Sequence, residues 1–294
     1  MKKNKIIYFA LLSLLSVTIT SCKKDNASIG GFDENGASHA LFSVSLTKQV
    51  RFSKGNLQYK ASTDTWRFAE NQYDYIGTDN ENISSSYNGW IDLFGWGTSG
   101  WNSGAVCYQP WSTEQEYSHY YPGGNYENNL TGACAEADWG VYNAISNGGN
   151  QSGMWRTLTK DEWEYLLSKH LKRKGKWAKG TIGGTFKGLI ILPDDWTKPE
   201  ELNYEAGDDD GYYTNEYTLS EWEEMEEAGA IFLPAAGERC RTDVDKVGKV
   251  GDYWSTTYDM DYYVHNMWFY DYSIQVGVCA RCSGAAVRLV QNAD

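Results

Sequence analysis

The sequence predicts an α+β protein in which a few helices pack on small antiparallel sheets. Short segments such as residues 42–46 alternate apolar and polar side chains, which is typical of strands with one buried face. Two Ser/Thr-x-x-Glu patterns stand before apolar stripes and indicate the starts of helices. Uninterrupted apolar runs such as residues 189–192 indicate buried strands. Because helices are few and short strands predominate, these segments favour the α+β class.

The expected elements follow one another within a single domain, because no repeat and no Pro-rich linker divides the chain. The first helix begins at Thr159, whose hydroxyl can accept the amide of Glu162, and Ser220 with Glu223 repeats this pattern. Gly229 supplies the stop of the second helix. We expect strands at residues 42–46, 50–52, 65–68, 189–192, 230–233 and 287–290, a third helix at residues 138–146, and irregular structure over residues 70–136.

Composition excludes several classes of protein. The chain has 294 residues with 26 Lys+Arg against 39 Asp+Glu, a net charge of −13. An acidic surface repels phosphate backbones, so no nucleic-acid partner is expected. Hydrophobic residues make up 41% of the chain, which is enough to bury a core and excludes disorder for most of it. The 13 Trp and 22 Tyr outnumber the 9 Phe, a balance that suits half-wet binding surfaces as well as cores.

The N-terminus resembles the signal of a bacterial lipoprotein. Three lysines precede the apolar run of residues 6–15, and residues 19–22 (ITSC) resemble a lipobox. The run is shorter than the roughly 20 apolar residues that a membrane helix needs. We therefore expect a signal peptide at residues 1–21, acylation of Cys22 as the attachment to the membrane, and a flexible tether at residues 22–39 before a domain at residues 40–294. These features imply an exported lipoprotein of the outer membrane that faces the cell surface.

The remaining cysteines do not indicate a metal or disulfide framework. With Cys22 lipidated, five are left, so at least one stays unpaired or pairs with another chain. Cys279 and Cys282 form one CxxC motif without the second that a zinc site needs. The four histidines, among them His119, stand isolated in the sequence and are assigned to the surface. Common hydrolase and nucleotide-binding motifs are missing, so we expect no cofactor, no metal and no catalysis.

Four segments in order resemble the formylglycine-generating-enzyme, or sulfatase-modifying, branch of the C-type lectin fold. Residues 155–165 (WRTLTKDEWEY) resemble its R-L-P-T-x-x-E-W-E signature, with an extra residue at Thr157 and with the capping Thr159 retained. Three further segments resemble the later core of that branch: residues 232–237 (FLPAAG), 251–255 (GDYWS) and 286–290 (AVRLV). The resemblance covers roughly residues 137–290 and implies a C-type lectin-like fold with two to three helices.

Within that branch, residues 253–290 resemble the variable segment of ligand-binding proteins that a diversity-generating retroelement mutates. Such a segment keeps a fixed framework and recodes adenine-rich codons, which yield Tyr, Asp, His, Ser and other residues but not Lys or Glu. Residues 251–294 contain neither Lys nor Glu, although the whole chain contains 37 of the two. Tyr gives such a surface a large, rigid contact area, and Ser, Asp and His add adaptable polar contacts.

The resemblance assigns many residues of this segment to the framework or to the binding surface. The implied framework consists of Tyr253, Trp254, Ser255, Asn266, Phe269, Ile274, Arg281, Gly284, Val287 and Arg288. The implied ligand-binding residues are Tyr258, Asp259, Asp261, Tyr262, Tyr263, His265, Tyr270, Tyr272, Val276, Val278, Cys279, Ala280, Cys282, Ser283, Ala285 and Ala286. Codon chemistry assigns Met260, Met267, Trp268 and Gln275 to the scaffold.

These observations predict a surface-displayed binding protein whose partner is a protein or another cell-surface ligand. One alternative is a copper-dependent oxidase of the same branch that uses Cys279 and Cys282, because Cys282 stands five residues before Val287 as in that family. The family's partner cysteine, however, lies farther upstream than Cys279. A further alternative is a structural cell-surface or adhesin component.

Overall fold

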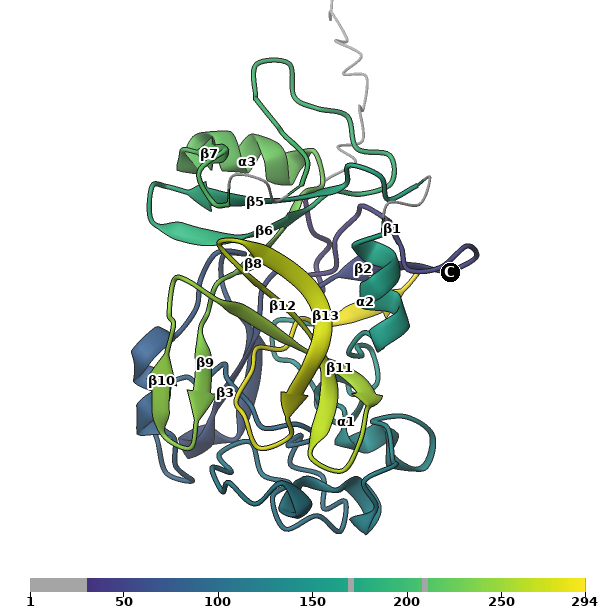
Figure 1. Cartoon of the computed structure of the whole chain (residues 1–294), viewed down its shortest axis with the longest axis vertical. Helices are drawn as coiled ribbons and strands as arrows, with labels where there is room; N and C mark the ends of the chain where they lie inside the picture. The colour runs from purple at the N-terminus through teal and green to yellow at the C-terminus, as the bar shows by residue number, and fades with distance from the viewer. Residues whose placement is uncertain (1–30, 169–171, 208–210, 294) are drawn as a thin grey trace, which may run out of the picture.

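The protein is built from five small sheets and a few short helices (Figure 1). The structure, a computed structural model, describes residues 31–168, 172–207 and 211–293. Over these residues, the α-helices are α1 (Trp139–Tyr142), α2 (Lys160–Leu166) and α3 (Leu219–Glu227). The 3-10 helices are η1 (Ala61–Thr63), η2 (Gly77–Asn82), η3 (Tyr117–Tyr120), η4 (Pro122–Gly124) and η5 (Gly132–Ala137). The predicted α+β class with small sheets is confirmed.

Nearly all strand pairs are antiparallel. One sheet contains β1 (Phe42–Ser43), β2 (Gln49–Phe52) and β14 (Val290–Asn292). A second contains β7 (Asn215–Tyr217), β5 (Trp177–Ile182), β6 (Phe186–Ile191) and β8 (Ile231–Pro234), with β5 and β7 parallel. A third contains β11 (Gly251–Tyr258), β12 (Tyr263–Tyr270) and β13 (Ser273–Ala280). The two-stranded sheets are β3 (Leu57–Lys60) with β4 (Thr65–Phe68), and β9 (Glu238–Cys240) with β10 (Asp243–Asp245).

The two ends of the described chain meet in the first of these sheets. Residues 290–292 pair with residues 50–52, so the C-terminus lies beside β1 and β2 (Figure 1). The preceding residues 31–39 already belong to the domain: Ala37 is fully buried, and it pairs with Ser53. The expected tether is therefore wrong over residues 31–39, because their apolar side chains pack in the core. The expected signal peptide and Cys22 lie outside the described residues.

The helix starts follow the capping pattern, with one shift. At α2 the capping box of Thr159 and Glu162 is confirmed. At α3 the cap is Thr218 with Glu221, two residues before the predicted Ser220. Starting the helix there buries Trp222 and Met225 on one face while Ser220 stays exposed. The stop at Gly229 is confirmed, since its φ of 91° is the left-handed conformation that favours glycine.

Three other predicted elements are shorter than expected. The helix expected at residues 138–146 ends at Tyr142, because Ser146 turns to hydrogen-bond the carbonyl of Trp66 beside β4. The strand expected at residues 287–290 begins only at Val290, although the carbonyls of Val287 and Leu289 accept backbone amides from Leu57 and Ser53. Residues 42–46 likewise contain only a two-residue strand. Residues 70–136 are irregular apart from 3-10 turns, as expected.

Strand β11 lies between two hydrophobic clusters, and its successive side chains point alternately into one and the other. Tyr253 packs in one cluster with Trp163 of α2, and Trp254 packs in the other with Trp96. The indole nitrogens of these tryptophans donate to backbone carbonyls: Trp163 to Trp254 at 3.2 Å and Trp96 to Ser255 at 2.8 Å. These two buried indole N–H groups thus bind carbonyls of β11, which fixes the position of the strand.

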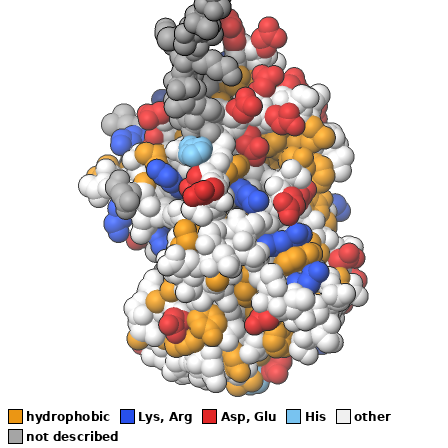
Figure 2. All heavy atoms as spheres, turned by 180° about the vertical axis from the view of Figure 1, so that it is seen from behind, with side chains coloured by type: hydrophobic (Ala, Val, Ile, Leu, Met, Phe, Trp, Pro, Cys, Tyr) orange, Lys and Arg blue, Asp and Glu red, His pale blue; other side chains and the backbone are white. Residues whose placement is uncertain are grey.

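The surface charge is uneven. Acidic side chains gather toward the end of the molecule that carries α3, as the back view shows (Figure 2). The nine residues of that helix include five Glu. In the described part of the chain, no helix has both the length and the apolarity that crossing a membrane would require.

The position of the α3 cap can be tested by two substitutions in one turn of helix. Thr218→Ala removes the hydroxyl that accepts the amide of Glu221, and we expect it to lower the free energy of unfolding by about 1 kcal/mol. Ser220→Ala, at the exposed position two residues later, should change it by less than about 0.5 kcal/mol. Urea unfolding of the two variants measures the difference, and the reverse order would restore Ser220 as the cap.

Candidate functional site

The sheet of β11, β12 and β13 presents one face to the core and the other to a pocket. Along β12, Met267 and Phe269 point into the core, and Trp268 and Tyr270 alternate with them on the opposite side. Helix α2 packs against all three strands of this sheet. The sheet is therefore supported from behind, and its strands β12 and β13 pair without interruption over residues 263–280.

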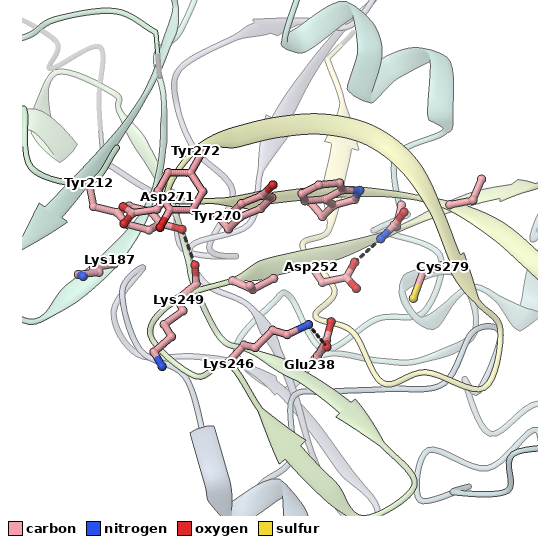
Figure 3. A pocket seen from close by; sticks show the side chains of 14 residues that line it. Lys187, Tyr212, Glu238, Lys246, Lys249, Asp252, Tyr270, Asp271, Tyr272 and Cys279 are labelled. Atoms are coloured by element: carbon pink, nitrogen blue, oxygen red, sulfur yellow. Dashed lines mark hydrogen bonds and ion pairs between the residues drawn. The ribbon is translucent and has the colours of Figure 1, made fainter. Parts of the chain in front are cut away.

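The pocket has a volume of about 630 Å³ and an aromatic wall (Figure 3). The rings of Trp268 and Tyr270 stack at 5.2 Å with an interplanar angle of 10°, and Tyr272 meets Tyr270 edge-on at 5.6 Å. Gly277 makes room for this stack, because a Cβ there would lie 2.7 Å from Nε1 of Trp268. A row of stacked rings on a supported strand is a preformed contact surface.

Charged and polar groups complete the pocket opposite the aromatic wall. Lys246 and Lys249 lie across from Tyr270 and Tyr272 (Figure 3), and Lys246 pairs with Glu238 at 2.6 Å. These residues belong to the stretch of β9 and β10 that directly precedes β11. They could not be recognised from the sequence, because no motif distinguishes them from other exposed charges.

Asp252 is a buried carboxyl that lines the pocket. It accepts a hydrogen bond from Nδ2 of Asn266 at 2.6 Å. The pKa of this carboxyl is raised to about 7, chiefly by burial and also by the charge of Glu238, while the hydrogen bond from Asn266 lowers it. A group with such a pKa can exchange a proton near neutral pH, so the pocket can offer a ligand either a donor or an acceptor.

The predicted framework is buried, and most of the predicted binding residues are not. Nine of the ten framework residues are buried, and Ile274 is half-buried. Tyr272 is 81% exposed and Tyr262 46%, whereas the other predicted binding residues, apart from two alanines, range from partly buried to exposed. Ala285 and Ala286 are the exceptions: both are fully buried, so their assignment to the binding surface is wrong. Their amides donate to Phe94 and Asp252 inside the core, where a larger side chain has no room.

The scaffold residues assigned by codon chemistry differ among themselves. Met267 is buried in the core, as a scaffold residue should be. Met260 is exposed at the β11–β12 turn, Gln275 is exposed on β13, and Trp268 lines the pocket. Three of the four residues assigned to the scaffold therefore contribute to the surface.

The predicted binding residues fall into two groups on the sheet. Tyr270, Tyr272, Val278 and Cys279 line the pocket. The two tyrosines lie at the β12–β13 turn, whereas Val278 and Cys279 lie farther along β13, opposite His265 and Val264. At the β11–β12 end are Tyr258, Asp259, Asp261, Tyr262, Tyr263 and His265. Val276 and Ala280 lie on β13, Val276 packing against the core, and Cys282 and Ser283 follow that strand.

The second group joins residues that the sequence analysis did not single out. The ring of Tyr262 lies 3.8 Å from that of Tyr117, and the hydroxyl of Tyr121 donates to Asp261 at 2.5 Å. We call Tyr117, Tyr121, Tyr126 and Tyr262 the tyrosine cluster. Three of its members come from the irregular segment, which gave no periodic signal by which they could be found.

Two buried cations donate to backbone carbonyls at the turns of this sheet. Nζ of Lys179 donates to the carbonyls of Tyr270 at 3.1 Å and Asp271 at 2.7 Å. Arg281 donates to the carbonyls of Asp261 at 3.1 Å, Tyr126 at 2.6 Å and Met260 at 3.2 Å, and its guanidinium also lies over the rings of Trp96 and Tyr121. We call Lys179 and Arg281 the backbone anchors. Because carbonyls are common to all residues, these hydrogen bonds do not require particular side chains in the turns.

The two thiols of the CxxC motif lie in different surroundings. All five described cysteines are free. Cys279 lines the pocket beside Asp252, and burial raises its pKa well above that of an ordinary thiol. Burial also raises the pKa of Cys282, which lies near Cys240. Both environments favour the neutral thiol over the thiolate that binds metals.

Comparisons with known protein families, with curated proteins and with solved structures find no match to this chain.

The raised pKa of Asp252 predicts a pH-dependent stability. An unfolded Asp loses its proton near pH 4, whereas the folded chain keeps it until about pH 7. The stability that Asp252 contributes is therefore full below about pH 4 and is lost as the pH rises through about 7. Asp252→Asn retains the shape without titrating, so we expect the stability of this variant relative to the parent to rise over that window. Chemical unfolding of both proteins at several pH values measures it; a difference that stays constant with pH would rule out the raised pKa.

Proposed function

We propose that this chain is a surface-displayed, ligand-binding lipoprotein without catalytic activity. In this proposal residues 253–290 form the binding surface on a C-type lectin-like scaffold, Cys22 carries the lipid anchor at the outer membrane, and the partner is a protein or another cell-surface ligand. The observation that carries it is the pocket with the aromatic wall of Trp268, Tyr270 and Tyr272. Rigid aromatic side chains with polar edges provide contact area at a low entropic cost.

The backbone anchors support the further proposal that the surface is diversified. A segment whose side chains vary must keep its conformation through interactions that do not vary. Lys179 and Arg281 provide such interactions, since both donate to backbone carbonyls of the turns that carry Tyr262 and Tyr272. The framework side chains behind them are buried, so changes at the surface need not disturb the core.

The lining of the pocket also favours a binder over an enzyme. The pocket combines a row of aromatic rings with the buried carboxyl of Asp252 and the thiol of Cys279 beside it. The two thiols that an oxidase would use lie in different surroundings, since Cys279 lines the pocket and Cys282 lies near Cys240. We therefore rank the copper-oxidase alternative below binding.

Tolerance to substitution tests the diversified surface. Tyr272→Ser changes the most exposed side chain of the β12–β13 turn, and we expect it to alter the free energy of unfolding by less than about 1 kcal/mol. Lys179→Met, at the anchor of the same turn, leaves two carbonyls without this donor and should cost at least about 2 kcal/mol. Denaturant unfolding of both variants decides the point. Equal losses would show that the turn depends on its side chains and would contradict the proposal.

The genetic part of the proposal is tested by sequencing the encoding locus. We expect a neighbouring reverse transcriptase gene and a template repeat that matches codons 253–290 except at adenines. If neither is present, diversification is refuted, and the pocket would remain as a fixed binding site.

Binding itself is tested with an array of purified surface proteins and glycans. We expect the purified chain to bind one class of probe, and the double variant Trp268→Ala, Tyr272→Ala to lose at least about tenfold in affinity, the loss expected when interface aromatics are truncated. Tyr142→Ala, which removes an exposed tyrosine far from the sheet in sequence, is the control and should retain binding. Undiminished binding by the double variant would exclude the aromatic wall as the site.

A further inference from the structure

The irregular segment before α1 brings together three side chains of the kinds that bind metals. Sγ of Cys107, a carboxylate oxygen of Glu114 and a ring nitrogen of His119 all lie within 4.8 Å of one another. Nδ1 of His119 forms an ion pair with Oε2 of Glu114. Cys107 is buried, His119 is partly exposed and Glu114 is exposed, so the cluster opens to solvent on one side. The expectation that His119 stands isolated is wrong in space, although it holds along the sequence.

The backbone fixes the positions of these three residues. The amide of Cys107 donates to the carbonyl of His119 at 2.8 Å, which pairs the two ends of the segment. The hydroxyl of the buried Tyr120 donates to the carbonyl of Glu114 at 3.0 Å and holds the intervening loop against them. The three donors therefore converge because of main-chain contacts that exist before any ion binds, as a preformed site requires.

The set of donors matches zinc better than other common ions. Zinc binds thiolate, imidazole and carboxylate at about 2.0–2.3 Å, whereas calcium and magnesium take oxygen ligands. Tetrahedral geometry at these bond lengths sets the donors roughly 3–4 Å apart, so small movements of the side chains of Glu114 and Cys107 would suffice. Copper(I) prefers soft ligands and would gain only one from this cluster.

We propose that Cys107, Glu114 and His119 form a zinc site with a fourth position open to water. Binding releases the thiol proton of Cys107 to solvent, and zinc takes its place on the sulfur. The site links the two ends of residues 107–119, and His119 belongs to η3. The same 3-10 turn carries Tyr117, whose ring lies beside that of Tyr262. Zinc would thereby order the tyrosine cluster at the β11–β12 end of the sheet. This inference does not rest on the proposed function.

Cobalt(II) is a suitable probe, because its bond to a thiolate gives a charge-transfer absorption band. We expect the reduced full chain to bind one Co²⁺ with this band, and zinc to displace it. Cys107→Ser should abolish the band, and His119→Ala should weaken Co²⁺ binding at least about tenfold. Cys134→Ser, at another buried thiol of the same segment, is the matched control and should leave band and affinity unchanged.

Two further variants keep the test decisive if Cys107→Ser does not fold. Glu114→Gln alters an exposed side chain and leaves the carbonyl that Tyr120 binds, so it should fold, retain the thiolate band and lose about tenfold in affinity. Cys282→Ser should have no effect. The proposal is overturned if the parent shows no band, if Glu114→Gln binds as tightly as the parent, or if Cys282→Ser removes the band, since the last result would place the metal at the CxxC motif.

Discussion

Strand β11 is buried on both faces over most of its length, and the two cores of the domain meet on it. Tyr253 on one side and Trp254 on the other belong to different clusters, and both carry polar atoms that the strand's neighbours satisfy. The hydroxyl of Tyr253 donates to the carbonyl of Pro234, and the indole of Trp254 donates to that of Phe94. Because a buried N–H or O–H without a partner is costly, these bonds permit one register of the strand only. These two hydrogen bonds therefore also fix the position of the sheet that carries the pocket.

The arrangement separates a rigid interior from an adaptable exterior. Helix α2 supports the sheet from behind, and the capping box at Thr159 fixes where that helix begins. On the outer side, rings of Trp268 and Tyr270 stack in a row that Gly277 makes possible. Ligand contacts on such a surface are gained or lost at the outer side chains, while the stability of the domain resides in the layer beneath.

Local signals in the sequence were the most informative. The cap at Thr159 follows from four residues, whereas the framework residues, nine of which are buried, were assigned by the resemblance to a known family. The α3 cap was placed two residues late, because Thr218 and Ser220 both precede a Glu by three positions, and only the burial of Trp222 and Met225 decides between them. The pocket and the Cys107 cluster were missed for another reason. Their members follow no regular spacing, and the conformation of irregular segments and turns brings them together. The same limit explains Ala285 and Ala286, whose burial no codon pattern reveals.

The backbone anchors also bear on the use of this domain as a scaffold for engineered binders. Antibody frameworks present loops whose conformations change with their sequence, so that each new specificity alters shape and composition together. Here Lys179 and Arg281 donate hydrogen bonds to main-chain oxygens of the turns. These bonds stabilise the backbone conformation of each turn whichever side chains the turn carries. In a combinatorial library built on these turns, the side chains would vary while the backbone conformation stayed nearly constant. The positions available for variation would end at residue 283, because the residues that follow are buried.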